Sequence, residues 1–168
     1  EFLRPFDLPV QGGTLAAGVL LCEDSWDENY AVHPMDLLAA HKPDLFFNLS
    51  ASPFTLGKNE KRHRMLTAAT GRLHVPMLYV NHRGLQNNGK DCYTFDGMTA
   101  AYSADGRLAG EAAPYTEARS AFLFDPETHA LTPERPMPPH TGDLLLPALR
   151  YGVSHFLKDI GVSRVVIG

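Results

Sequence analysis

The stretch Gly18–Trp26, with the sequence GVLLCEDSW, decides the fold of this chain. The apolar run from Leu15 to Leu21 is too short for a core helix and predicts a buried strand. It stops at Cys22, which is followed by two acids. A thiol at the point where a buried strand gives way to a polar loop is held by the strand and exposed by the loop. Cys22 is therefore a candidate nucleophile, and a buried structural cysteine is the alternative.

Strands and helices alternate through the first half of the chain. Residues 1–13 predict irregular structure because prolines and a Gly-Gly pair interrupt them. Helices are predicted over residues 34–41 and 59–73, and strands over residues 44–49 and 75–81. The order strand, helix, strand, helix, strand predicts an α/β layer arrangement.

The predicted helix over residues 59–73 has an apolar stripe and a basic side. Met65, Ala69 and Leu73 recur four residues apart and predict the buried stripe. The other side carries Lys58, Lys61, Arg62 and Arg64. For most of these cations we expect a solvent-exposed helix face.

The pattern changes after residue 81. Residues 84–89, rich in Gly and Asn, predict a mobile loop. Short segments separated by turn signals predict antiparallel strands, at residues 92–95, 99–103, 108–111 and 120–124.

The last part of the chain predicts a linker and the start of a second domain. Five prolines between residues 125 and 141 are typical of a semi-rigid linker. A helix from Thr141 or Asp143 to about Ile160 follows, with Gly161 as its C-terminal cap and a strand over residues 162–167. We therefore expect a domain over residues 1–124, a linker over 125–141 and the beginning of another domain over 142–168.

Composition excludes several classes of protein. The 168 residues are 44% hydrophobic and 20% charged, which is typical of a globular protein. A net charge of -4 favours neither a nucleic acid nor an anionic membrane as partner. No apolar run is long enough to span a bilayer, and two cysteines without framework spacing indicate a reducing, cytoplasmic setting. The eight histidines form no His-x-x-x-His pair, so we predict no metal site.

Several motifs, in order, resemble one known family. Leu21–Trp26 (LCEDSW) is similar to the nucleophile motif of the nitrilase superfamily, and more narrowly to the glutaminase domain of glutamine-dependent NAD+ synthetases. The likeness continues through Asn48–Phe54 (NLSASPF) with Gly57-Lys58, through residues 75–81, and through Phe95–Gly97. Residues 161–168 resemble the strand that opens the synthetase domain of that family.

The resemblance implies a fold, an activity and a set of site residues. The fold would be α/β: part of a nitrilase-like α-β-β-α sandwich, then the start of a Rossmann-like ATP-pyrophosphatase-type domain. Cys22 would hydrolyse glutamine, and Glu23, Ser52 and Lys58 would bind it. The ammonia would serve ATP-dependent amidation of nicotinic acid adenine dinucleotide to NAD+, with ATP and Mg2+ bound outside these residues. Nitrilase-like domains usually pair through their helices, so by analogy we expect a homo-oligomer.

One departure from the family limits this expectation. The family uses a glutamate as general base and a lysine, and both precede the cysteine. Here all five lysines follow Cys22. We therefore expect the sequence to be an internal piece of a longer protein and to be inactive alone. Two alternatives stay open: a stand-alone nitrilase-family amidase, and a non-catalytic nitrilase-like module.

Overall fold

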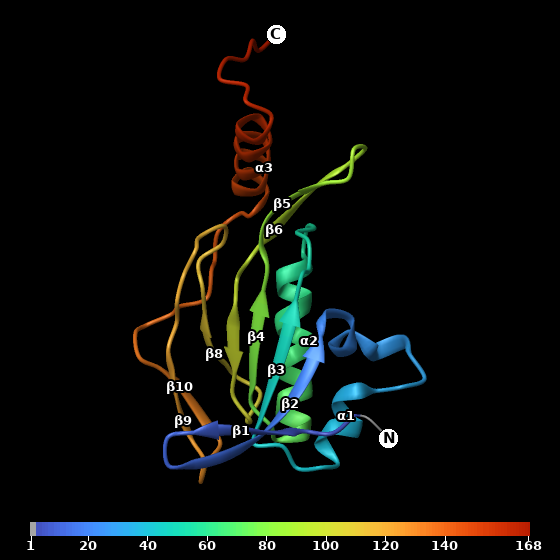
Figure 1. Ribbon diagram of the computed structural model, residues 1–168, viewed down its shortest axis with the longest axis vertical. Helices are drawn as coiled ribbons and strands as arrows, with labels where there is room; N and C mark the ends of the chain where they lie inside the picture. Colours follow the sequence, from blue (N-terminus) through green and yellow to red (C-terminus); the bar gives the residue numbers. More distant parts are fainter. Residues whose placement is uncertain (1–2) are drawn as a thin grey trace.

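A six-stranded sheet forms the body of the protein in the computed structural model, which describes residues 3–168 (Figure 1). Residues 1–2 of the predicted first domain lie outside the described part. The strands, in their order across the sheet, are β1 (Phe6–Val10), β2 (Gly13–Leu21), β3 (Leu45–Ser50), β4 (Met77–Asn81), β7 (Ala100–Tyr102) and β8 (Leu108–Glu111).

The three central strands run parallel and confirm the predicted alternation. Leu21 of β2 lies beside Leu49 of β3, and Leu49 lies beside Val80 of β4. Parallel strands place their carboxyl ends at the same edge of a sheet, where ligands bind in open α/β sheets. Whatever follows β2, β3 and β4 in sequence is therefore brought together in space.

Two helices cover one face of this sheet. They are α1 (Pro34–Ala39) and α2 (Lys58–Leu73), and α2 runs along the sheet in Figure 1. Met65 and Leu66 of α2 pack with Phe46 and Tyr79 of the sheet in the main core. Both predicted helices are thereby confirmed, because their apolar stripes face the buried side of the strands.

The other face of the sheet is only partly covered within residues 3–168. The hairpin of β9 (Phe122–Asp125) and β10 (Ala130–Pro133) places Leu131 against Leu45 and Ala101. At the carboxyl end of the parallel strands, by contrast, Leu21 and Leu49 are 61% and 47% exposed. One sheet with helices on one face is part of an α-β-β-α sandwich, so the predicted α/β class is confirmed.

Two segments predicted as irregular or mobile are strands. β1 pairs antiparallel with β2, and Gly12 takes a positive φ in the turn between them. β5 (Arg83–Asn87) and β6 (Cys92–Asp96) form a second hairpin. Neither β1 nor β5 has the apolar run that marks a strand in sequence, because both are held mainly by backbone hydrogen bonds along an edge.

The segment predicted as a linker, residues 125–141, contains strand β10. Helix α3 (Leu145–Asp159) follows it as predicted. At its N-terminal end, the Asp143 carboxylate accepts the N–H groups of Leu145 and Leu146. At its C-terminal end, the N–H groups of Gly161 and Val162 donate to the carbonyls of Lys158 and Leu157. These hydrogen bonds confirm that Asp143 caps the N-terminal end of α3 and that Gly161 caps the C-terminal end.

The strand predicted over residues 162–167 is not formed. Val166 and Ile167 are 98% and 92% exposed, and no strand of the described chain lies beside them. An apolar run becomes a strand only when another strand pairs with its backbone. The predicted strand does not form because no such partner is present among residues 3–168.

Among residues 3–168, no helix combines the length and the apolar character that a membrane-spanning helix needs.

Candidate active site

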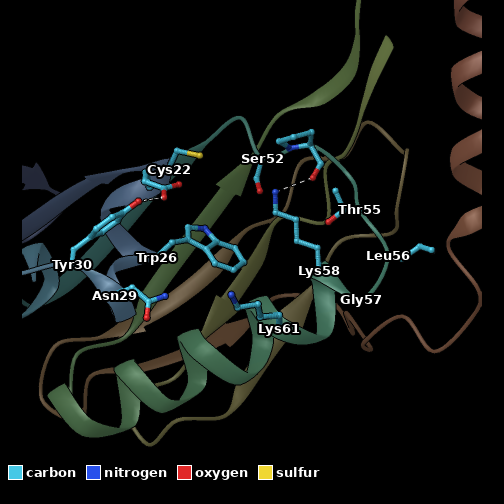
Figure 2. A pocket seen from close by; sticks show the side chains of 12 residues that line it. Cys22, Trp26, Asn29, Tyr30, Ser52, Thr55, Leu56, Gly57, Lys58 and Lys61 are labelled. Atoms are coloured by element: carbon cyan, nitrogen blue, oxygen red, sulfur yellow. Dashed lines mark hydrogen bonds between the residues drawn. The ribbon is translucent and has the colours of Figure 1, made fainter. Parts of the chain in front are cut away.

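A cavity of about 520 Å3 opens where the parallel strands end. Cys22 directly follows β2, Ser52 lies two residues beyond β3, and Lys58 begins α2. All three line the cavity (Figure 2). Glu23 lines it as well. The structure thus brings every predicted site residue to one place.

Cys22 lines this cavity with a strained backbone conformation. Its φ of 41° lies in the left-handed region that side chains other than glycine rarely adopt. The Asp24 carboxylate accepts the N–H of Leu21 at 2.9 Å, and the Ser25 hydroxyl donates to the carbonyl of Cys22 at 3.1 Å. These bonds hold the turn that directs the half-buried thiol toward the side of the cavity where Ser52 lies.

Glu23 provides negative charge beside the thiol. Its carboxylate is exposed and accepts a 2.7 Å hydrogen bond from the Tyr30 hydroxyl. This hydrogen bond and the charge of Glu23 raise the pKa of Tyr30, because both favour the protonated phenol. Sequence reasoning did not single out Tyr30, since no spacing links it to Glu23.

Two lysines provide positive charge on the opposite side. The ammonium of Lys58 donates to the carbonyl of Pro53 at 3.1 Å and lies 5.8 Å from the centre of the Trp26 ring. The ammonium of Lys61 lies 5.5 Å from the same ring. Trp26 lines the cavity between these cations (Figure 2).

The pKa of Lys58 is lowered, first by burial and then by the nearby guanidinium of Arg62. Cys22, Asp96 and Glu23 act in the opposite direction. A partly desolvated ammonium is an effective point charge for a carboxylate ligand, since water screens the attraction less.

Arg62 is the exception to the solvent-exposed face that the sequence predicts for most cations of α2. The side chain is completely buried, whereas Lys61 and Arg64 on the same helix are exposed. Its guanidinium donates to Asn59 at 2.9 Å, stacks 4.9 Å from the Tyr79 ring centre, and lies 3.7 Å from the Asp96 carboxylate. Asn59 lies on α2 itself, but Tyr79 and Asp96 come from β4 and β6, so helix periodicity alone does not reveal these two partners.

Ser52 is buried behind the cavity surface and is fixed by Asn81. Its backbone N–H donates to the side-chain oxygen of Asn81 at 2.9 Å. The side-chain nitrogen of Asn81 in turn donates to Asp96 at 3.0 Å. Asn81 and Asp96 belong to motifs that resemble the family, but the sequence did not distinguish a structural role from a site role.

A group of metal-ligand side chains lies outside this cavity. Asp27, His33 and Asp36 each present one ligand atom within 4.8 Å of the others, a clustering that the sequence did not predict. Both carboxylate oxygens of Asp36 are bound by the guanidinium of Arg72. This ion pair places a positive charge where a cation would need the carboxylate.

No protein-family model matches the chain. Curated relatives do match it. The glutamine-dependent NAD(+) synthetase of Synechocystis sp. is 31% identical over 160 residues, which are 90% of this chain and 28% of the relative. The corresponding protein of Rhodobacter capsulatus is 29% identical over 167 residues, 98% of this chain and 29% of the relative. The resemblance to glutamine-dependent NAD+ synthetases is confirmed. The chain spans less than a third of the length of these synthetases.

Solved structures agree on the fold. The glutamine-dependent NAD+ synthetase from Acinetobacter baumannii, in complex with ADP, matches with a TM-score of 0.77 and 23% identity over 94% of this chain and 28% of that one. A carbon-nitrogen hydrolase from Helicobacter pylori G27 matches with a TM-score of 0.55 and 18% identity, over 68% of this chain and 41% of that one. The nitrilase-like expectation for the fold is therefore confirmed.

An amidase from Nesterenkonia sp. AN1 has the same fold, with a TM-score of 0.50 and 22% identity over 66% of this chain and 38% of that one. A variant of that amidase shows covalent addition of the acetamide moiety of fluoroacetamide at its active-site cysteine.

Proposed function

We propose that the protein containing this chain hydrolyses the side-chain amide of glutamine at Cys22. The ammonia then serves the ATP-dependent amidation of nicotinic acid adenine dinucleotide to NAD+. The observation that carries the proposal is the shared cavity of Cys22, Ser52 and Lys58 at the carboxyl ends of β2 and β3. The named activity of the relatives and the cysteine adduct of the Nesterenkonia amidase support it.

The charges of the cavity suit the two ends of an amino acid. Lys58 attracts the α-carboxylate, and Ser52 at the same wall adds a polar group beside it. Glu23 attracts the α-ammonium group. Binding at these residues leaves the side-chain amide of glutamine directed to Cys22, so the reacting carbon is positioned before the chemistry begins.

The proposed reaction is acyl transfer to sulfur. The Cys22 thiolate attacks the amide carbon, and the resulting tetrahedral intermediate expels ammonia after its nitrogen takes up a proton. The S-acyl bond that remains is a thioester of glutamate. Water attacks this thioester, releases glutamate and returns the thiol. A thiol of ordinary pKa is only a few per cent ionised at neutral pH, so a base must assist the first step.

We also propose that residues 1–168 alone do not turn over glutamine. The family places its general base and its lysine ahead of the nucleophile, and all lysines here follow Cys22. Ammonia release by the isolated segment should therefore be absent under conditions in which the full-length protein releases it. Measurable turnover by the segment contradicts this part of the proposal.

Domain limits and assembly belong to the same proposal. Residues 1–124 are the later part of the glutaminase domain, residues 125–141 connect it, and residues 142–168 begin the synthetase domain. The full-length protein is a homo-oligomer. The exposed apolar side chains of α3, including Leu146 and Leu149, are consistent with a helix that packs against further protein.

Covalent labelling tests the nucleophile directly. A glutamine analogue with a chloromethyl ketone in place of the amide should alkylate Cys22 of the full-length protein, with chloride as leaving group. Cys92 is the internal control, because it is more exposed than Cys22 but lies outside the cavity. Peptide mass spectrometry should find the adduct on Cys22, and excess glutamine should slow its formation at least about tenfold. Equal labelling of both cysteines, without protection by glutamine, contradicts the proposal.

A further inference from the structure

We infer that Asn81 is a positioning residue for glutamine binding, which acts by holding the backbone of Ser52 at the cavity wall. Asp96 and Arg62 in turn hold Asn81. The inference rests on the proposed function, since it concerns how the same site recognises glutamine. None of these three side chains lines the cavity, so each acts through another residue.

Ser52 needs such support because it lies beyond the end of the sheet. Ser50 is the last residue of β3 that pairs with β4, and it lies beside Asn81. Two residues later, Ser52 is 2% exposed, and no strand among residues 3–168 pairs with its backbone. A buried backbone N–H or carbonyl without a partner is costly, so another group must take the place of a strand.

The Asn81 side chain takes that place. Its amide oxygen accepts the N–H of Ser52 at 2.9 Å, and its amide nitrogen lies 3.3 Å from the carbonyl of Ser52. One primary amide thus meets both polar groups of a single residue, as an adjacent strand does in a ladder. Pro53 follows and restricts Ser52 to extended geometry, so the two constraints together leave the residue little freedom.

Asp96 sets which way the Asn81 amide faces. A carboxylate only accepts hydrogen bonds, so the amide nitrogen must face the Asp96 oxygen at 3.0 Å. The amide oxygen is then left for the N–H of Ser52. Asp96 is 1% exposed, and the guanidinium of Arg62 lies 3.7 Å from it and compensates its charge. The orientation of Ser52 therefore depends on groups from β4, β6 and α2.

The experiment is a double-mutant cycle in the full-length protein, with glutamine or ammonia as nitrogen source. Asn81→Ala should raise the KM for glutamine roughly 10- to 100-fold, because it removes two hydrogen bonds that hold the binding residue. The kcat at saturating glutamine should change less than about threefold, and ammonia-dependent synthesis should not change. In a Ser52→Ala background, Asn81→Ala should add less than about threefold to KM, because the side chain that it positions is already gone.

Glu111→Gln is the matched control. Glu111 is also buried and hydrogen-bonded, to Asn59, His63 and the N–H of His140, but it does not touch Ser52. Its replacement should lower the melting temperature and leave the KM for glutamine unchanged. If Asn81→Ala does not fold, Asp96→Asn replaces it in the cycle. This substitution keeps the side-chain volume and removes the carboxylate that orients the Asn81 amide. We expect a smaller rise in the KM for glutamine than in Asn81→Ala.

Three results overturn the inference: full additivity of the two substitutions, a KM rise in Glu111→Gln equal to that in Asn81→Ala, or an unchanged KM in Asn81→Ala. Each of these leaves the proposed function standing. Retention of glutamine-dependent synthesis by Cys22→Ala overturns the proposed function itself, and the inference with it.

Discussion

Replacing Cys22 with alanine should abolish NAD+ formation from glutamine and leave NAD+ formation from ammonia intact. The proposed thioester cannot form without the sulfur, and loss of a covalent nucleophile typically lowers kcat by a factor of about 10^4 or more. Free ammonia enters after this step, so the second reaction does not depend on the thiol. The measurement is the rate of NAD+ formation by the full-length protein with each nitrogen source at saturation.

Alanine is the appropriate substitution because of the backbone at this position. Cys22 holds a φ of 41°, and alanine keeps the Cβ atom that makes this geometry unfavourable. The variant therefore changes the chemistry without relieving the strain of the turn. Cys92→Ala, on the hairpin of β5 and β6, is the matched control and should retain both activities. A parallel loss of both activities in Cys22→Ala indicates a folding defect and contradicts the expected selectivity.

Replacing Arg62 with methionine should lower the free energy of unfolding by about 3–5 kcal/mol near neutral pH, the range found when one partner of a buried ion pair is removed. Arg62 is completely buried and lies 3.7 Å from the buried carboxylate of Asp96. Its loss removes the main counter-charge of that carboxylate. Methionine has a similar length and apolar stem, so the change in packing is kept small. Urea unfolding of the purified protein gives the free energy.

The expected loss depends on pH in a defined direction. Burial raises the pKa of Asp96, and Arg62 opposes that rise. Removal of Arg62 therefore raises the pKa of Asp96 further in the folded state. A carboxyl group whose pKa is higher in the folded than in the unfolded state reduces stability as the pH rises above the unfolded value of about 3.9. The difference in the free energy of unfolding between wild type and Arg62→Met should be smaller at about pH 5 than at about pH 8.

Two further variants separate charge from packing. Arg62→Met with Asp96→Asn removes both charges, so much of the lost stability should return. Arg72→Met removes an arginine from the exposed end of the same helix, where it pairs with Asp36, and should lower the free energy of unfolding by less than about 1 kcal/mol. Equal losses in Arg72→Met and Arg62→Met, or no recovery in the double variant, contradict the role of the buried ion pair.

The central strands and the long helices were predictable because their apolar residues follow the period of the element that buries them. The run ending at Leu21 and the stripe through Met65 are examples. The strand over residues 92–95 was predicted and is β6, whereas its partner β5 was missed because β5 has little apolar sequence and is defined mainly by its pairing with β6. The run at residues 162–167 was assigned a strand on its apolar character, which is insufficient without a neighbouring strand.

The sequence by itself determined the parallel strands, the thiol that follows the first of them, and the motifs that resemble glutamine-dependent NAD+ synthetases. These features are local, since each depends on residues that are adjacent or regularly spaced in the chain. Only the tertiary structure decided that Arg62 is buried while Lys61 is exposed, and that Asn81 holds Ser52. The reason is physical: burial and hydrogen bonding are set by partners from other elements, and the packing of α2 on the sheet determines which partners each side chain meets.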